Sequence, residues 1–185
     1  TQSVIDAIDP LKDVDGFHPI NIGKLLLGEK GGFSTCTPLG ITKLMESCHI
    51  SFEGKHVVIV GRSNIVGKPL AAMLMQKNKL CNATVTVVHS KTTNLSELCS
   101  LADVLIVAIG KPNFITSKMV KKGAIIIDAG INHTDQGLVG DVDFEDVKQY
   151  ASMITPVPGG VGPMTIAMLL SNTYESYHKK NKVLS

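Results

Sequence analysis

The chain has 185 residues, of which 44% are hydrophobic and 18% charged, and its formal net charge is +2. This composition predicts a packed globular protein rather than a disordered one, and so small a charge gives no reason to expect a nucleic-acid or membrane partner. No apolar run approaches the roughly 20 residues of a membrane span, and the first ten residues lack the basic start and apolar centre of a signal peptide.

The four cysteines, Cys36, Cys48, Cys81 and Cys99, form no C-x-x-C pair and no spacing typical of a metal site. Reduced thiols are the simplest reading of such a pattern. We therefore expect a cytoplasmic compartment, with a mitochondrial one as the alternative, and no bound metal.

The first 50 residues contain little that resembles a strand. A helix is predicted over residues 1–8, followed by a loop at 9–19 that is rich in acids, proline and glycine. A helical turn at 21–28 and a helix at 40–48 come next. This segment contributes little sheet of its own, so we expect it to belong to a second region packed against the rest of the chain.

The remainder of the chain alternates between apolar runs and helical patterns. The runs are apolar on consecutive positions and β-branched, which is typical of strands buried on both faces of a parallel sheet. Such runs occur at residues 56–60, 84–89, 103–109 and 124–129. Helices are predicted at 69–76, at 95–101, at 143–151 and from the start of the run 162–180. Strand and helix in alternation predict an α/β fold with a doubly wound parallel sheet.

The turn after the first strand, GRSNIVGKP, is the first candidate binding site, because ligands of open α/β sheets lie at the carboxyl ends of strands. A P-loop is a poor match: five residues separate Gly61 from Gly67, and Pro69 stands where Ser or Thr would bind magnesium. A dinucleotide turn is a partial match, since Ser63 replaces the second glycine and the last glycine comes one residue late. A glycine turn without a ligand is the third possibility.

The end of the second strand favours a dinucleotide. NAD enzymes place an Asp or Glu there for the ribose hydroxyls, whereas this chain has His89, Ser90, Lys91 and Thr92. Hydroxyl groups and a cation, together with Arg62, suit the 2′-phosphate of NADP. Lys91 by itself would be interpreted as a solvated surface lysine, and only its position at a strand end beside Ser90 supports a role in binding phosphate.

Several long motifs, in this order, resemble one enzyme family. They are KDVDGFHPINIGKL (residues 12–25), CTPLGI (36–41), GRSNIVGKP (61–69), HSKT (89–92) and TPVPGGVGPMTIAMLL (155–170). The sequence is similar to the bifunctional methylenetetrahydrofolate dehydrogenase/cyclohydrolases. The resemblance implies a Rossmann-like NADP-binding domain and the remnant of a second α/β catalytic domain. It also implies a homodimer whose small-molecule substrate is a folate.

The resemblance further implies two reactions of one-carbon metabolism, a supply route for purine biosynthesis. The first is the NADP-dependent oxidation of 5,10-methylenetetrahydrofolate to the 5,10-methenyl form, and the second is hydrolysis of that product to 10-formyltetrahydrofolate. Positions implied to bind the cofactor are Gly61, Arg62, Ser63, Ser90, Ala108, Gly110, Ile131, Gly162 and Thr165, of which Ala108, Gly110 and Ile131 are implied to line its nicotinamide half. Positions implied to bind the folate are Asp15, Pro158 and Gly159.

These substrate positions make chemical sense, and each has a structural alternative. A carboxylate such as Asp15 can accept two N–H bonds from an amino-pyrimidine ring, but a turn or capping aspartate is common in a D-x-D-G loop. In PVPGGVGPM the prolines stiffen the loop and the glycines let a flat ligand approach the backbone. The alternative for that stretch is a plain interdomain loop.

The family's general acid/base, a lysine in a Y-x-x-x-K motif, has no counterpart in this sequence. The three tyrosines Tyr150, Tyr174 and Tyr177 are followed four residues later by Ile154, His178 and Asn181. The family's assisting glutamine is missing as well, so we assign no catalytic residue. We expect residues 1–35 to be the remnant of the catalytic domain, 36–160 the NADP-binding domain and 161–185 a C-terminal helix that packs back on the catalytic domain.

Two consequences follow from these departures. The hydrolytic step is expected to be severely impaired in this chain alone, and apolar faces of the remnant are expected to be exposed. A non-catalytic NADP-binding module or paralogue is the alternative function. Some other Rossmann dehydrogenase is a third possibility, which the combined motifs disfavour.

Overall fold

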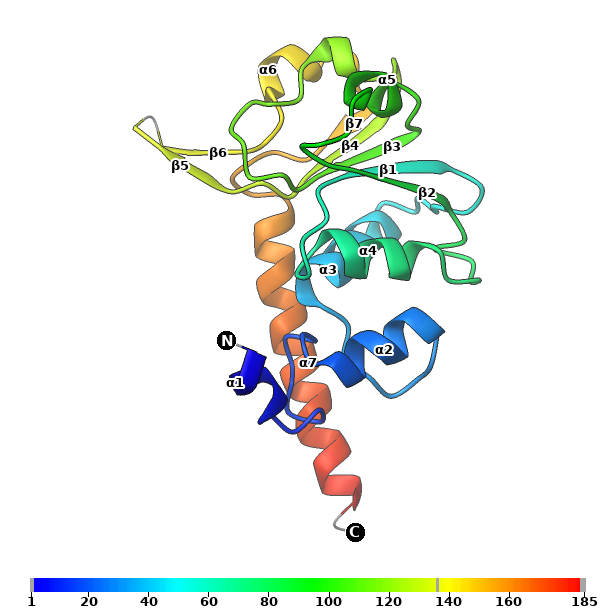
Figure 1. The fold of residues 1–185 in the computed structure, drawn as a ribbon, viewed down its shortest axis with the longest axis vertical. Helices are drawn as coiled ribbons and strands as arrows, with labels where there is room; N and C mark the ends of the chain where they lie inside the picture. The colour runs from blue at the N-terminus through cyan, green and yellow to red at the C-terminus, as the bar shows by residue number, and fades with distance from the viewer. Residues whose placement is uncertain (1, 136, 184–185) are drawn as a thin grey trace.

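The computed structural model describes residues 2–135 and 137–183, and its centre is a five-stranded parallel sheet (Figure 1). Across the sheet the order is β2 (Thr84–Val88), β1 (His56–Val60), β3 (Val104–Val107), β4 (Ile125–Asp128) and β7 (Met153–Ile154). The order reverses between β1 and β3, so the first turn lies at the switch point where open α/β sheets bind ligands. The predicted doubly wound α/β fold is confirmed.

Helices cover both faces of this sheet. The described helices are α1 (Gln2–Asp6), α2 (Pro19–Leu27), α3 (Cys36–Ser47), α4 (Gly67–Leu74), α5 (Leu95–Ser100), α6 (Phe144–Val147) and α7 (Val161–Val183), with a 3₁₀ turn η1 (Ser117–Met119). Figure 1 shows α3 and α4 on one face and α5 and α6 on the other. None of the helices in the described residues is both long and apolar enough to cross a bilayer.

Strand β1 shows why the sheet has two cores. Val57 and Ile59 point to the face that α3 and α4 cover, and Val58 and Val60 point to the face that α5 and α6 cover. All four side chains are fully buried. Because both faces are covered, the strand is apolar on consecutive residues rather than on alternate ones, which is the pattern that predicted it.

Several boundaries and elements differ from the prediction. Helix α4 begins at Gly67 rather than Pro69, because proline is tolerated anywhere in the first turn of a helix and does not mark its first residue. The exposed hairpin of β5 (Asn132–Thr134) and β6 (Gly137–Val139) was not predicted, nor was the two-residue strand β7. These strands are too short to show an apolar period.

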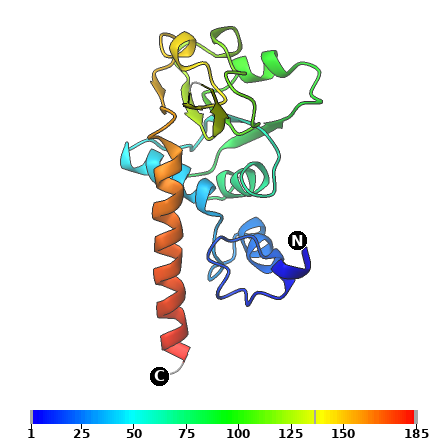
Figure 2. The ribbon, with the colours of Figure 1, turned by 90° about the vertical axis from the view of Figure 1, so that its left-hand side faces the viewer.

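The N-terminal helices lie away from the sheet and beside the lower part of α7 (Figures 1 and 2). Asn172, buried in α7, donates hydrogen bonds to the carbonyl oxygens of Val14 at 2.8 Å and Ser34 at 3.1 Å. Ser176 donates to the carbonyl oxygen of Leu11 at 2.6 Å. These bonds fasten α7 to the loop between α1 and α2 and to the segment before α3, while α3 packs along the upper part of α7. The division at residues 35 and 160 stays a prediction.

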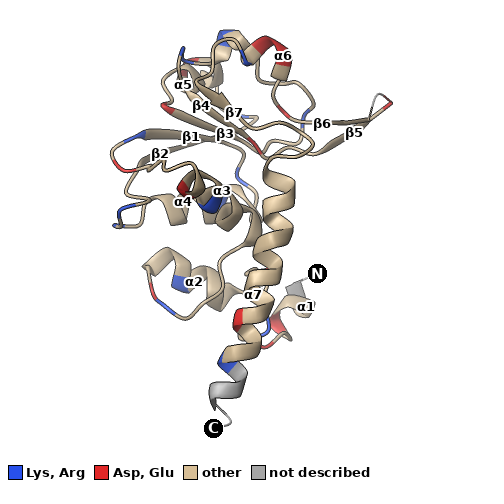
Figure 3. Ribbon diagram, turned by 180° about the vertical axis from the view of Figure 1, so that it is seen from behind, with Lys and Arg blue, Asp and Glu red and all other residues tan. Residues whose placement is uncertain are grey.

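Helix α7 carries an exposed apolar stripe. Ile166, Leu170, Tyr174 and Tyr177 follow one another at spacings of four, four and three residues, and are 58 to 68% exposed. Such spacing places them on one face of the helix. No charged residue occurs in α7 before Glu175, as Figure 3 shows by the uniform tan of its upper part. The stripe lies outside residues 1–35, the segment for which the sequence predicts exposed apolar faces; there Val4, Leu26 and Leu27 are 60 to 73% exposed.

The buried thiols are expected to lower the free energy of unfolding at alkaline pH. Burial raises the pKa of the Cys99 thiol from its ordinary 9.0 to about 11. Burial and, to a smaller extent, the negative charge of Asp15 also raise the pKa of the Cys36 thiol to about 11. Between pH 9.0 and about 11 these thiols lose their protons in the unfolded chain but keep them in the folded chain. The free energy of unfolding should therefore fall as pH rises through this range. Each thiol should contribute on the order of 2–3 kcal/mol.

Urea unfolding below pH 9 and near pH 11 measures this slope. The variant Cys99→Ala should show a smaller slope, and Cys48→Ala, at an exposed position, should not. An equal slope in the wild-type protein and in Cys99→Ala would contradict the assignment.

Candidate functional site

The turn after β1 requires its two glycines. Gly61 is buried with φ +128°, and a Cβ there would overlap the carbonyl oxygen of Ala108 and lie 2.9 Å from its carbon. A Cβ on Gly67 would lie 2.7 Å from the carbonyl carbon of Gly61 and 2.8 Å from the Cα of Arg62. The end of β1, the start of α4 and the end of β3 are therefore in backbone contact, as a dinucleotide turn requires.

Residues 62–65 of this turn are exposed, and one hydroxyl organises the turn. Ser63 Oγ accepts hydrogen bonds from the backbone N–H of Val66 at 3.0 Å and of Gly67 at 3.4 Å. Lys68 Nζ donates to Asn64 Oδ1 at 2.7 Å. Ser63 thus shapes the turn at the positive end of α4, where an anionic group is favoured.

The register of the sheet brings the two predicted phosphate residues to one level. Val60 of β1 pairs with Val88 of β2, and Gly61 N–H donates to the carbonyl oxygen of Val88 at 2.8 Å. Arg62 and Ser90 each lie two residues beyond this pair. Both are exposed, and Ser90 Oγ has no hydrogen-bond partner among the described residues. Arg62 and Ser90 thus lie at the same edge of the sheet, and both are open to solvent.

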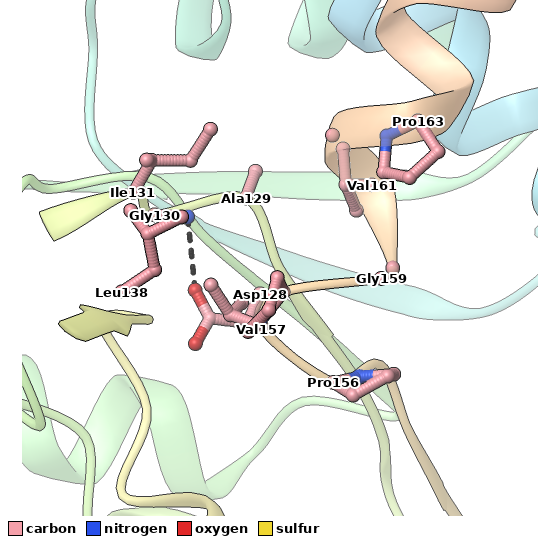
Figure 4. Close-up of a pocket in the computed structure, with 13 residues that line it drawn as sticks. Asp128, Ala129, Gly130, Ile131, Leu138, Pro156, Val157, Gly159, Val161 and Pro163 are labelled. Carbon is pink, nitrogen blue, oxygen red and sulfur yellow. Dashed lines mark hydrogen bonds between the residues drawn. The ribbon is translucent and has the colours of Figure 1, made fainter.

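A cavity of about 200 Å³ lies between the loop after β4 and the loop before α7 (Figure 4). It brings together four predicted residues, Ile131, Pro158, Gly159 and Gly162. The other lining residues are Asp128, Ala129, Gly130, Leu138, Pro156, Val157, Gly160, Val161 and Pro163. Apart from one aspartate the wall is uncharged, which suits a flat aromatic ring.

Four other predicted residues do not line this cavity. Ala108 and Gly110 follow β3, and Ala108 lies next to Gly61. Thr165 is one turn into α7, where its hydroxyl lies 3.0 Å from that of Thr37. Asp15 lies on the loop between α1 and α2 and does not line the cavity. The cavity therefore brings two predicted cofactor positions together with two predicted substrate positions, and Asp15 lies outside it.

The loop of Asp15 is held by a different carboxylate. Asp13 is buried and accepts hydrogen bonds from the backbone N–H of Phe17 at 3.1 Å and of His18 at 2.8 Å, and from Asn21 Nδ2 at 2.8 Å. Asp15 is exposed and accepts no hydrogen bond from the described residues. The turn-forming role that was the alternative for Asp15 thus belongs to Asp13, which leaves Asp15 open to a ligand.

Two buried carboxylates beside the cavity were not predicted from the sequence, Asp128 at the end of β4 and Asp141 after β6. Burial raises the pKa of the Asp128 carboxyl above its ordinary range, although three backbone N–H groups oppose the shift. Nothing in the pattern marks either residue: Asp128 ends an apolar strand, and Asp141 resembles any loop acid. Among the described residues no cluster of three or more potential metal ligands occurs.

The comparison with known families decides the assignment. Residues 35–181 match the profile of the NAD(P)-binding domain of tetrahydrofolate dehydrogenase/cyclohydrolase. The chain belongs to this family. The resemblance expected from its motifs is confirmed.

Individual relatives agree with this assignment. The chain is 55% identical to the bifunctional protein FolD of Chlamydia felis over 96% of its own length and 64% of that protein. The structure matches the bifunctional enzyme FolD of Campylobacter jejuni with a TM-score of 0.92 and 53% identity, over 97% of this chain and 63% of the other. It matches the Trypanosoma brucei dehydrogenase-cyclohydrolase, complexed with NADP cofactor and inhibitor, with a TM-score of 0.87 and 35% identity, over 97% and 62%. The chain thus spans slightly less than two thirds of these proteins.

Proposed function

We propose that the chain is the cofactor-binding part of a bifunctional folate enzyme. Its activities would be the NADP-dependent oxidation of 5,10-methylenetetrahydrofolate and the hydrolysis of the methenyl product to the 10-formyl form. The observation that carries the proposal is the turn after β1, where Gly61 packs under the Ala108 carbonyl while Arg62 and Ser90 share one register level. NADP is preferred because a cation and a hydroxyl occupy the place of the usual ribose-binding acid.

The residues present fit a dinucleotide. Gly61 leaves the space that a Cβ would fill, and Ser63 shapes the exposed turn at the start of α4. When bound, the cofactor would supply a hydride acceptor, and this chain's part is position and orientation, since hydride transfer needs no acid or base from the protein. The uncharged wall around Ile131 and Gly162 would hold the ring and exclude water.

The folate would contact two parts of the chain. The Asp15 carboxylate is exposed and has the two acceptor oxygens that an amino-pyrimidine ring needs. Pro158 and Gly159 form the rim of the cavity, where Gly159 has φ +103° and brings its backbone to the surface. We place the substrate against this rim on the basis of the family resemblance. A homodimer and a role in supplying purine biosynthesis are proposed on the same basis.

Cofactor choice can be tested by calorimetry. Arg62→Ala and Ser90→Ala should each weaken NADP⁺ binding roughly tenfold, because each removes a charge-assisted hydrogen bond to the 2′-phosphate. Binding of NAD⁺ should change little in both variants.

The matched controls are Lys122→Ala and Ser96→Ala, which remove an exposed cation and an exposed hydroxyl elsewhere on the surface. Neither should alter the preference for NADP⁺. Equal weakening of NADP⁺ and NAD⁺ by Arg62→Ala would show that Arg62 does not read the 2′-phosphate. Failure of the wild-type chain to bind either cofactor would overturn the proposed function.

A further inference from the structure

Two buried aspartates, linked by a hydrogen bond, lie at the carboxyl edge of the sheet. Asp128 is the last residue of β4 and is 3% exposed, and Asp141 follows β6 and is 0% exposed. The backbone N–H of Asp141 donates to Asp128 Oδ1 at 3.0 Å, so the position of one side chain fixes the backbone that carries the other. Buried carboxylates are expected only where they are fully hydrogen-bonded.

Asp141 binds the loop after β3. Its Oδ2 accepts the backbone N–H of Ile109 at 2.7 Å and of Gly110 at 2.8 Å. Its Oδ1 accepts the backbone N–H of Lys111 at 3.0 Å and Asn132 Nδ2 at 2.8 Å. Each oxygen therefore accepts two bonds, which is the pattern of an ionised carboxylate. Three consecutive amides of one loop are turned inward to a single side chain.

Asp128 joins the loop after β4 to the segment after β6. Its Oδ1 accepts the backbone N–H of Gly130 at 2.9 Å, the bond drawn in Figure 4, and its Oδ2 accepts that of Val142 at 2.9 Å. A Cβ on Gly130 would overlap the Asp141 carboxylate, and one on Gly140 would overlap that of Asp128. Both glycines therefore allow the two acids to approach the backbone closely.

The loops held by this pair are those that carry the positions assigned to the nicotinamide half of the cofactor. Gly110 is bonded directly to Asp141, and Ile131 lies between Gly130 and Asn132, whose bonds go to the two acids. Asp128 also lines the cavity, and it is the only lining residue with an ionisable side chain. The pair thus holds residues 129–131 in the wall of the cavity, and Asp128 supplies the ionisable group of that wall.

We propose that Asp141, acting with Asp128, positions the loop after β3 for the nicotinamide ring and makes the cavity favour the oxidised dinucleotide over the reduced one. The inference rests on the proposed dinucleotide function. The oxidised ring carries a positive charge and the dihydro ring is neutral, so buried negative charge beside the cavity stabilises only the first. The attraction is strong here because the pair is shielded from water.

The test compares Asp141→Asn with Asp146→Asn in the full chain. Asp146 is a matched control, since it too holds a loop, accepting the backbone N–H of Ser117 at 2.7 Å and its hydroxyl at 2.9 Å, but does not line the cavity. Calorimetry with NADP⁺ and with NADPH gives the ratio of the two affinities. Hydrogen exchange without cofactor measures the protection of the backbone amides of residues 109–111.

In Asp141→Asn the preference for NADP⁺ over NADPH should fall roughly tenfold, and the amides of residues 109–111 should lose protection. Asp146→Asn should leave both unchanged. The affinity ratio separates charge from mere loosening, because a loosened loop weakens the binding of both redox forms alike. If Asp141→Asn does not fold, Asp128→Asn serves for the same measurement, since Asp128 lines the cavity itself.

An unchanged affinity ratio, or unchanged protection at residues 109–111, would overturn the inference while leaving the proposed function intact. If the wild-type chain binds neither NADP⁺ nor NADPH, the proposed function falls, and the inference about the redox form of the ligand falls with it. These outcomes are distinguishable because wild-type binding is measured first.

Discussion

Gly61→Ala is expected to destabilise the fold by more than about 3 kcal/mol and to abolish dinucleotide binding. Two effects combine at this position. The backbone has φ +128°, which residues with a Cβ rarely adopt, and the new methyl group would overlap the Ala108 carbonyl. Because Ala108 directly follows β3 and its N–H donates to the Val60 carbonyl oxygen, its own carbonyl can move only if the ends of two central strands separate. Chemical unfolding and NADP⁺ titration measure the two losses.

Gly123→Ala is the matched control for this prediction. Gly123 also has a positive φ, of +82°, but a Cβ there would have no heavy atom within 4 Å. It should lose only the backbone preference, about 1 kcal/mol, and should bind NADP⁺ normally. If both variants lost the same stability, the close approach of β1 and β3 would not be what requires glycine at position 61.

The sheet could be predicted because each buried strand is marked by a short apolar run of its own residues. Val57 to Val60 are buried alternately on two faces that helices cover, so an unbroken apolar run was sufficient to predict β1. The hairpin of β5 and β6 was not predictable by this route, since its six residues are exposed or half-buried and carry no apolar alternation. Asn132 of this hairpin donates a hydrogen bond to the buried Asp141, a contact that the fold creates.

The candidate site was predictable only where it involves backbone close to the motif. The turn at Gly61 could be recognised because a missing Cβ is visible in the sequence. The roles of Asp128 and Asp141 could not, because each depends on amides brought together by the fold, up to 32 residues away in the case of Ile109. Likewise the sequence could not show which acid of the loop at 13–15 forms the turn, and burial of Asp13 answers that.

A polypeptide limited to residues 1–185 should bind NADP⁺ yet hydrolyse the methenyl substrate about 10²- to 10⁴-fold more slowly than a full-length relative. This is the typical contribution of a positioned proton carrier, and the sequence has no Y-x-x-x-K lysine to provide one. The loss of methenyl absorbance measures the hydrolysis, and calorimetry measures cofactor binding on the same sample.

The apolar stripe on α7 indicates how this activity would be restored. The Chlamydia felis relative is longer than the matched region, which is 64% of its length, and we propose that a segment of this kind covers Ile166, Leu170, Tyr174 and Tyr177. Joining the upstream segment of that relative to Thr1 should restore hydrolysis and shield the stripe. Leu170→Ser should then weaken the restored activity, because Leu170 would lie in the new interface.

Leu101→Ser is the control for that substitution, since Leu101 is 58% exposed, close to the 66% of Leu170, and follows α5 on the far side of the sheet. It should leave the restored hydrolysis unchanged. A fused protein that folds and binds NADP⁺ but does not hydrolyse the methenyl substrate would favour the alternative, a dinucleotide-binding module without catalysis. Restored hydrolysis that depends on Leu170 would assign the chain to the catalytic members of its family, because a surface with no partner in the enzyme would tolerate serine.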